Sequence, residues 1–350
     1  MKYCLISLAA MCLAFNVQAK PINTMLGHLD ALSNPASGIG PRPPASDAEK
    51  KAADYIETQW QAQGYTVVNS PFTYTLRDKT YSSQNVSITL PGKSDDMLYI
   101  AAHYDSIGND SHGVIDNAAS VALLLTLSET LASQSLPISI TMLAFGAEEV
   151  SMQGSKAYVK TLSQEQLNKA VGMINLDTVV GGDILYIHSA HSTPYDCAKE
   201  TGTYSHSPSL RDELLAYSNT FFKQQTYTLH PEYKGYPEGE TGYWSDHSPF
   251  ACLGIPIAYL EATNFTINGK EGFDGYSQTT HNAMWDCFDD KQNTACDRDA
   301  EKQWGNIWHT SNDNTDVLKT AFPKRIGTQL NIHYQLLLNY LMASSNNQSE

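Results

Sequence analysis

Short apolar runs alternate with helix-like segments along the first half of the chain, and this alternation restricts the fold more than any other feature. The runs at 97–102, 138–145 and 171–176 are apolar enough for buried strands, and helical patterns at 118–131 and 152–162 separate them. Strands and helices that alternate with short connections are typical of a sheet covered by helices on both faces. The sequence therefore predicts an α/β fold with a doubly wound, mostly parallel central sheet flanked by helices.

The rest of the pattern fits one continuous domain. No internal repeat or long linker divides the chain, so we expect a single domain over 20–350. We further predict a helix over 47–62 that is capped by Ser46, and strands over 65–69 and 85–90. A closing helix is expected over 317–343, interrupted near Pro323.

The first nineteen residues have the pattern of a secretory signal. Lys2 precedes an apolar run over 3–15, and Val17-Gln18-Ala19 provides the small residues of a cleavage site after Ala19. The run is shorter than the roughly 20 apolar residues that span a bilayer. We therefore expect a signal peptide over 1–19, no membrane anchor, and a secreted or periplasmic protein.

The charge balance bears on partners. The chain has 22 Lys and Arg against 37 Asp and Glu, a formal net charge of −15, and no cluster of basic residues interrupts this excess. A surface of this kind repels a phosphate backbone, so nucleic acid is not an expected partner.

Four cysteines lie beyond the predicted signal, Cys197, Cys252, Cys287 and Cys296. An even number in an exported protein predicts disulfide bonds. Three pairings are possible, and we favour Cys287 with Cys296 because the two flank a short polar loop.

Acidic and imidazole side chains follow the three buried runs. At the carboxyl ends of strands in an open α/β sheet these groups meet in one crevice, and carboxylates packed together need a cation to neutralise them. A mixed set of histidine and carboxylate ligands suits zinc, and two zinc ions would use this much negative charge. The residues concerned are His103 and Asp105, Glu148 and Glu149, Asp177, and Asp116 just before the apolar helix.

Several ordered segments resemble the zinc aminopeptidases of family M28. They cover roughly residues 40 to 340 in the order of that family, and they are 102–106, 115–120, 145–149 with Gly154-Ser155, 175–177, 245–250 and 308–310. The resemblance implies a peptidase that acts on the N-termini of peptides or proteins with two zinc ions per chain.

The resemblance also implies a role for each matching residue. One zinc would be held by His103 and Asp177 and the other by Glu149 and His309, with Asp116 bridging both. Glu148 would be the general base that takes a proton from the water between the ions, because zinc lowers the pKa of such a water towards neutrality.

We also expect particular roles or geometry for three further residues. Asp105 lies two positions after His103, on the same side of an extended chain, and is predicted to orient that imidazole. The resemblance implies a cis peptide bond between Asp116 and Asn117 and makes Tyr243 the candidate for stabilising the oxyanion.

Asp246 and His247 form part of one matching segment. Since five ligands are already assigned, we expect these residues to support the ligands or line the pocket. The other histidines match no ligand position.

A long acidic loop precedes His309. Between Lys270 and Gln303 it contains eight acids and four bases, and the acids are Glu271, Asp274, Asp286, Asp289, Asp290, Asp297, Asp299 and Glu301. A loop of this charge beside the site favours substrates with a basic first residue.

Two alternatives remain open at this point. A glutaminyl cyclase shares the fold and the segments at 246–250 and 308–310 but works with one zinc. A non-catalytic binding protein on the same fold would have lost ligands, whereas all five are present here.

Overall fold

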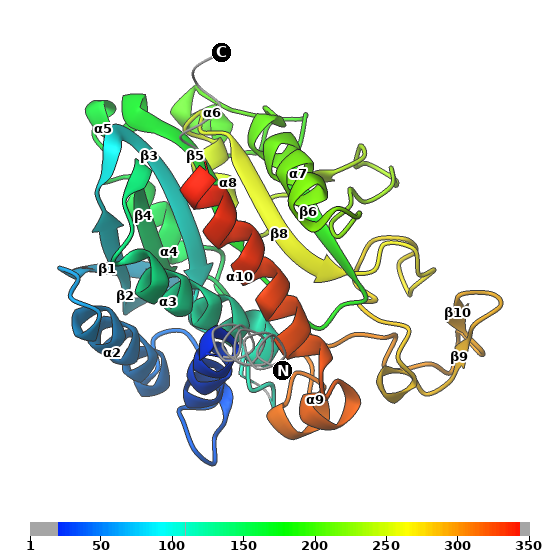
Figure 1. Cartoon of the computed structure of the whole chain (residues 1–350). Coiled ribbons are helices and arrows are strands. Elements are labelled where there is room, and N and C mark those ends of the chain that lie inside the picture. The colour runs from blue at the N-terminus through cyan, green and yellow to red at the C-terminus, as the bar shows by residue number, and fades with distance from the viewer. Residues whose placement is uncertain (1–19, 109, 344–350) are drawn as a thin grey trace, which may run out of the picture.

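A twisted eight-stranded sheet forms the centre of the molecule (Figure 1). The computed structural model describes residues 20–108 and 110–343, and the predicted signal peptide lies outside them. The strands, in their order across the sheet, are β1 (Val68–Leu76), β2 (Lys79–Leu90), β4 (Leu136–Phe145), β3 (Gly92–His103), β5 (Ala170–Leu176), β8 (Ile257–Thr263), β6 (Ile184–Ala190) and β7 (Glu240–Thr241).

The middle of the sheet is parallel and its flanks are partly antiparallel. Strands β4, β3, β5 and β8 run parallel to one another, whereas β1 with β2, β2 with β4 and β8 with β6 are antiparallel. The predicted mostly parallel sheet is confirmed, with an antiparallel hairpin that the prediction did not include. Arg77 and Asp78 form its two-residue turn, both with left-handed φ angles of 48° and 63°, as tight hairpin turns require.

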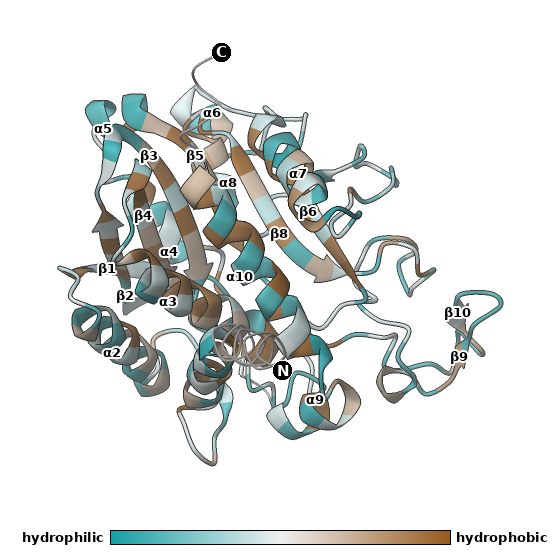
Figure 2. Cartoon of the chain, viewed as in Figure 1, coloured by the Kyte–Doolittle hydropathy of each residue, from teal (hydrophilic) through white to brown (hydrophobic). Residues whose placement is uncertain are grey.

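Helices cover both faces of the sheet. On β3, Leu98, Ile100 and Ala102 pack into one apolar cluster, while Tyr99 and Ala101 pack into a second. This alternation follows from the two-residue period of a strand. The larger cluster includes residues of α2 (Asp47–Ala62), α3 (Ala119–Leu131), α7 (Ser209–Phe222) and α10 (Arg325–Ala343), and the smaller one those of α4 (Gln153–Val159), α5 (Gln164–Lys169) and α8 (His247–Ala251). The doubly wound arrangement is thus confirmed, and Figure 2 shows apolar residues concentrated in the strands and in α3.

Helix α3 is the central core helix. The stretch Val114–Leu131 is long and apolar enough to cross a membrane, and within the part of the chain that the structure describes it is the one helix of this kind. It is 89% buried inside the fold. Its composition therefore matches the interior of the protein.

The predicted helix boundaries agree with the structure in two places. Ser46 Oγ accepts a hydrogen bond from the Glu49 backbone N–H at 3.1 Å and begins α2. Pro323 separates α9 (Thr315–Ala321) from α10, as its missing N–H dictates. The remaining short elements are η1 (Val114–Ala118), α6 (Ala198–Thr201), η2 (Asn282–Met284), β9 (Phe288–Asp289) and β10 (Thr294–Ala295).

Within residues 20–108 and 110–343, two disulfide bonds fix loops around the sheet. Cys287 bonds to Cys296 within the long loop after β8, which confirms the predicted pairing, and Cys197 bonds to Cys252. Asp183 holds the same long loop against the sheet edge, since its carboxylate accepts hydrogen bonds from Thr279 Oγ1 at 2.6 Å and Thr280 N at 2.8 Å. The loop is therefore anchored where it approaches the carboxyl ends of the strands.

Candidate metal centre and substrate pocket

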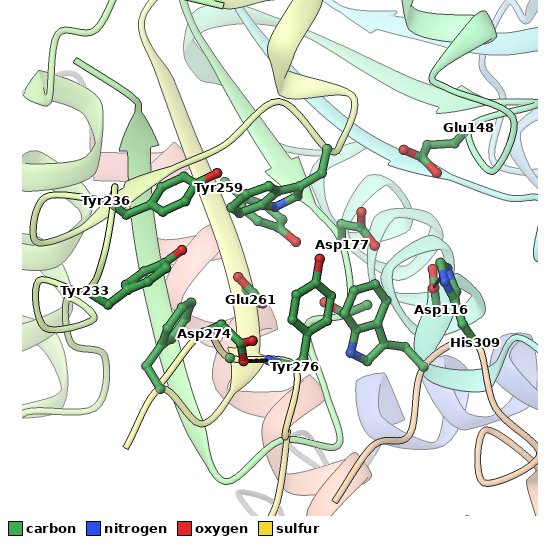
Figure 3. A pocket seen from close by; sticks show the side chains of 15 residues that line it. Asp116, Glu148, Asp177, Tyr233, Tyr236, Tyr259, Glu261, Asp274, Tyr276 and His309 are labelled. Atoms are coloured by element: carbon green, nitrogen blue, oxygen red, sulfur yellow. Dashed lines mark hydrogen bonds and ion pairs between the residues drawn. The ribbon is translucent and has the colours of Figure 1, made fainter. Parts of the chain in front are cut away.

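The predicted ligands lie at the carboxyl edge of the parallel strands, and Figure 3 shows three of them, Asp116, Asp177 and His309. His103 is the last residue of β3, and Asp177 directly follows β5. Glu149 lies in the turn after β4, Asp116 in the irregular turn η1, and His309 in the long loop. Strand direction thus brings together residues that are far apart in the sequence.

The five residues form two triads that share one carboxylate. In the first, His103 Nε2 lies 3.2 Å from Asp116 Oδ1 and 3.3 Å from Asp177 Oδ1. In the second, His309 Nε2 lies 3.0 Å from Asp116 Oδ2 and 3.0 Å from Glu149 Oε2. All ligand atoms of a triad are within 4.8 Å of one another. Asp116 directs one oxygen to each triad, the arrangement expected of a bridging ligand.

Burial makes the site unfavourable without cations. It raises the pKa of Glu149 to about 7 and that of Glu148 well above its usual range. Burial opposes the charged form of His309 too, but the carboxylates of Asp116 and Glu149 outweigh it and raise the pKa to about 11. Glu149 Oε1 is buried and has no hydrogen-bond partner among the residues that the structure describes. The nitrogen and oxygen donors and this free oxygen fit a zinc ion.

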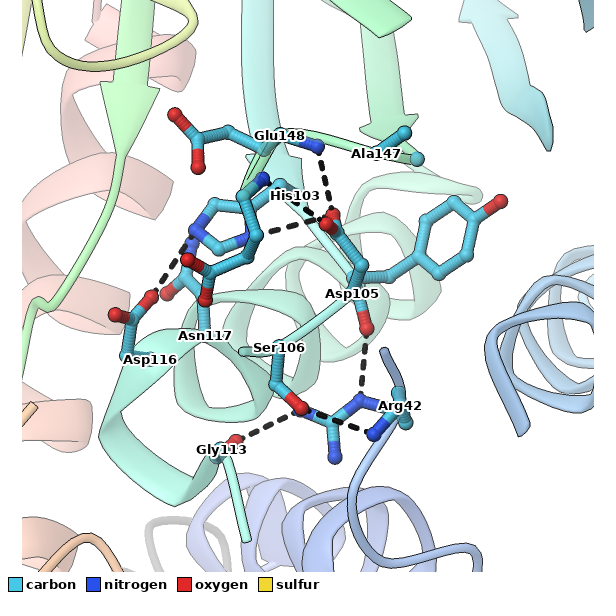
Figure 4. Close-up of polar contacts among 12 residues, drawn as sticks. Arg42, His103, Asp105, Ser106, Gly113, Asp116, Asn117, Ala147 and Glu148 are labelled. Carbon is cyan, nitrogen blue, oxygen red and sulfur yellow. Dashed lines mark hydrogen bonds and ion pairs between the residues drawn. The ribbon is translucent and has the colours of Figure 1, made fainter. Parts of the chain in front are cut away.

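Asp105 contacts a residue of each triad, His103 of the first and the backbone of Glu149 of the second (Figure 4). Its Oδ1 lies 3.5 Å from His103 Nδ1 and accepts a hydrogen bond from the Glu148 backbone N–H at 3.0 Å. Its Oδ2 accepts another from the Glu149 N–H at 3.1 Å. The residue is fully buried, so these contacts fix the histidine and the turn after β4 relative to each other.

Two residues that the sequence analysis did not single out shape the turn that carries Asp116. Asp313 accepts hydrogen bonds from the backbone N–H groups of Val114 and Ile115, both at 2.9 Å, and of Asp116 at 3.3 Å. The fully buried Arg42 donates to the carbonyl oxygens of Tyr104 at 2.7 Å and Gly113 at 2.8 Å (Figure 4). Neither belongs to a recognisable local motif.

The peptide bond between Asp116 and Asn117 is cis, as the resemblance implied. Asn117 Nδ2 donates to the Leu176 carbonyl oxygen at 2.9 Å. The turn that carries Asp116 is thereby tied to the end of β5.

Asp246 and His247 lie next to the site and outside both triads. His247 Nε2 is 2.9 Å from the Gly242 carbonyl oxygen, and its ring stacks on Tyr259 with centroids 5.2 Å apart. Burial raises the pKa of the neighbouring Asp246 to about 7. In the same segment, Ser245 Oγ donates to Asp177 Oδ2 at 2.7 Å.

Tyr243 packs against Tyr195, with ring centroids 5.6 Å apart, and Lys156 Nζ lies 5.4 Å from the centre of its ring. Its neighbour Trp244, rather than Tyr243 itself, borders the cavity beside the triads. The catalytic role of Tyr243 therefore stays a prediction.

A cavity of about 410 Å³ opens beside the triads. Asp116, Glu148, Asp177 and His309 form one side (Figure 3). The other lining residues are Thr178, Tyr233, Tyr236, Trp244, Tyr259, Glu261, Phe265, Asp274, Gly275, Tyr276 and Trp308. A substrate that fills the cavity would lie against the candidate ligands.

One of the eight acids of the long loop, Asp274, borders this cavity. Others hold the loop together: Glu301 Oε1 accepts a hydrogen bond from the Asp286 N–H at 2.9 Å, and Asp289 Oδ1 accepts one from the Lys291 N–H at 2.9 Å. The charge that faces the cavity is therefore smaller than the loop composition implied. Glu261 also lines this cavity and adds a second carboxyl group to it. The sequence analysis gave Glu261 no role, and the one sign of its importance in the sequence is an acidic residue within an apolar strand.

Comparisons with known proteins relate the chain to a peptidase family. The model of peptidase family M28 matches residues 85–332. The alkaline phosphatase isozyme conversion protein of Escherichia coli is 30% identical over 302 residues, which are 80% of this chain and 79% of that protein. The aminopeptidase YwaD of Bacillus subtilis is 35% identical over 111 residues, 30% of this chain and 24% of that protein.

Solved structures show the same fold at lower identity. A zinc aminopeptidase from Bacillus subtilis superimposes with a TM-score of 0.62 at 15% identity, over 93% of this chain and 96% of that one. A Porphyromonas gingivalis glutaminyl cyclase superimposes with a TM-score of 0.61 at 18% identity, over 91% of this chain and 97% of that one.

Fold and site together define a hydrolase of the metallo-aminopeptidase class, as predicted. The chain belongs to peptidase family M28.

Proposed function

We propose that this peptidase is an exported aminopeptidase that removes the first residue of peptides and proteins with the help of two zinc ions. The proposal rests on the position of the Asp116 carboxylate, whose Oδ1 lies at one triad and whose Oδ2 lies at the other. His103 and Asp177 would complete one zinc site, and Glu149 and His309 the other. When bound, zinc activates water and polarises a carbonyl group.

Glu148 is the proposed general base. Its carboxyl group borders the cavity, while its backbone is held by Asp105. It accepts a proton from the attacking water and returns it to the amino group that leaves. Asp105 keeps both His103 and Glu148 in place for this transfer.

Tyr243 remains the proposed donor to the oxyanion, because the family resemblance implies a tyrosine with this role shortly before the segment 245–250. Removal of a donor of this kind costs about 100-fold in kcat or more. Replacement by phenylalanine is therefore its test, and an unchanged kcat would remove it from the mechanism.

Export and substrate preference complete the proposal. The two disulfide bonds support an oxidising compartment outside the cytoplasm, secreted or periplasmic. Carboxyl groups that line the cavity support a preference for a basic first residue.

Metal content and product identity test the proposal together. We expect two zinc ions per chain and release of a free amino acid from a peptide amide, with loss of activity after chelation and recovery with zinc. One zinc ion per chain together with pyroglutamate formation from N-terminal glutamine would instead identify a glutaminyl cyclase, the alternative that the shared fold supports.

A further inference from the structure

Among the carboxyl groups that line the cavity beside the triads, that of Glu261 has the most distinctive surroundings. Strand β8 pairs with β5 in parallel through Leu260 and Leu176, and the Asp177 N–H donates to the Leu260 carbonyl oxygen at 3.5 Å. The next position on β8 is Glu261, next to Asp177 on a strand about 5 Å away. A residue bound at the first triad therefore has Glu261 beside it.

The carboxyl group of Glu261 is mostly buried. Its side chain is 15% exposed, and among residues 20–108 and 110–343 no lysine or arginine pairs with it. His188 Nε2 lies 3.0 Å from Oε2, but burial lowers the pKa of His188 to about 3 and raises the pKa of Glu261 to about 8, so His188 supplies no positive charge to stabilise the ionised form of Glu261. A buried carboxylate without a counter-ion is unfavourable, and a cation that enters the cavity relieves it.

Aromatic rings form the walls around this carboxyl group (Figure 3). Tyr233 and Tyr236 stack with centroids 4.8 Å apart, and Tyr276 and Trp308 stack with centroids 5.4 Å apart and planes within 7°. Aromatic faces attract cations and cover the aliphatic stem of a long basic side chain. The half-buried Asp274 adds negative charge at the same cavity.

We propose that Glu261 determines specificity by pairing with a cationic side chain on the first residue of the substrate, inside the aromatic cavity. This inference rests on the proposed aminopeptidase function. The triads hold the amino end of the substrate, and the side chain of its first residue extends towards β8. A neutral side chain of the same length leaves Glu261 without a partner.

Arginine and citrulline substrates provide the test, because citrulline has nearly the shape of arginine without its charge. The zinc-loaded enzyme is expected to cleave an arginine amide with a kcat/KM about 100-fold above that for the citrulline amide. Glu261→Gln should lose about 100-fold on the arginine amide and leave the citrulline and leucine amides within about threefold of wild type. Glu271→Gln removes the same charge from an exposed position of the nearby loop and should behave as wild type.

Binding provides a second readout. By calorimetry, free L-arginine should bind the wild type more tightly than L-citrulline, and Glu261→Gln should abolish the difference while Glu261→Asp restores part of it. Equal binding of the two ligands by the wild type, or an equal loss on all substrates in Glu261→Gln, would overturn the role of Glu261. If the wild type cleaved none of the amides, the aminopeptidase proposal would fail, while the binding comparison would still decide the role of Glu261.

Discussion

Asp105 Oδ1 accepts a hydrogen bond of 3.0 Å from the backbone N–H of Glu148. The same carboxylate accepts the N–H of Glu149 and lies 3.5 Å from His103 Nδ1. One buried side chain thus aligns a histidine of the first triad, a glutamate of the second and the proposed base.

Replacement of Asp105 should therefore weaken metal binding as well as catalysis. We expect Asp105→Asn to lower zinc affinity about 10- to 100-fold, as is typical when a partner of a metal ligand is removed. Competition with a chelator measures this affinity, and far-UV circular dichroism checks the fold. The exposed Asp54→Asn is the control, and zinc affinity of wild-type strength in Asp105→Asn would exclude the orienting role.

Asp313 should be important for the stability of the protein and for the shape of η1, the turn that carries Asp116. Asp313→Ala leaves the N–H groups of Val114, Ile115 and Asp116 without their acceptor, and each buried unpaired group costs about 1–3 kcal/mol. We expect a clear fall in the melting temperature and weaker zinc binding at both triads.

Calorimetry with and without zinc measures both effects of Asp313→Ala. Asp316→Ala removes a carboxylate three residues away, at an exposed position, and should leave the melting temperature nearly unchanged. A melting temperature that does not distinguish the two variants would contradict the importance of Asp313.

His333 should make the fold sensitive to acid. Its Nδ1 lies 2.9 Å from the Tyr227 hydroxyl and its Nε2 lies 2.6 Å from the Val179 carbonyl oxygen, and burial lowers its pKa to about 4. The unfolded chain binds the proton first, near pH 6.5, so the contribution of His333 to stability is complete above that pH. It is lost as the pH falls towards 4, at up to about 1.4 kcal/mol per pH unit.

Denaturant unfolding of the zinc-free protein between pH 7 and pH 4 measures this dependence. In His333→Gln, the free energy of unfolding should fall less steeply between pH 7 and pH 4 than in the wild type, although it is lower at pH 7. An unchanged slope would show that His333 does not titrate on unfolding.

The two disulfide bonds should differ in their contributions to stability. Cys197–Cys252 closes a separation of 55 residues and Cys287–Cys296 one of 9. Loop entropy predicts losses of about 4 and about 3 kcal/mol when each pair is replaced by serines. Equilibrium unfolding of the two double variants tests this order, and a larger loss for the shorter loop would contradict it.

The clustering of the five candidate ligands could be predicted from the sequence because each follows an apolar run or lies in a recognisable segment. Strand direction alone brings His103 and Asp177 together. Arg42 and Asp313 could not be predicted in this way, since their partners Gly113 and Asp116 lie 71 and 197 residues away in sequence and no local pattern marks such contacts.

The hairpin of β1 and β2 was missed for a different reason. Most of β1 is exposed or only partly buried, so its apolar alternation is weak, and Arg77-Asp78 lacks the glycine that usually marks a tight turn. The side of the cavity opposite the candidate ligands was not predicted either. Tyr233, Glu261 and Tyr276 come together there only in the folded protein, because they are far apart in the sequence.

The rate of Glu148→Gln decides whether Glu148 is the general base. This substitution preserves the shape of the side chain and removes its ability to accept a proton. With two zinc ions per chain verified by metal analysis, we predict that kcat on a peptide amide falls about 100- to 10,000-fold. A kcat close to wild type with both ions bound would contradict the account.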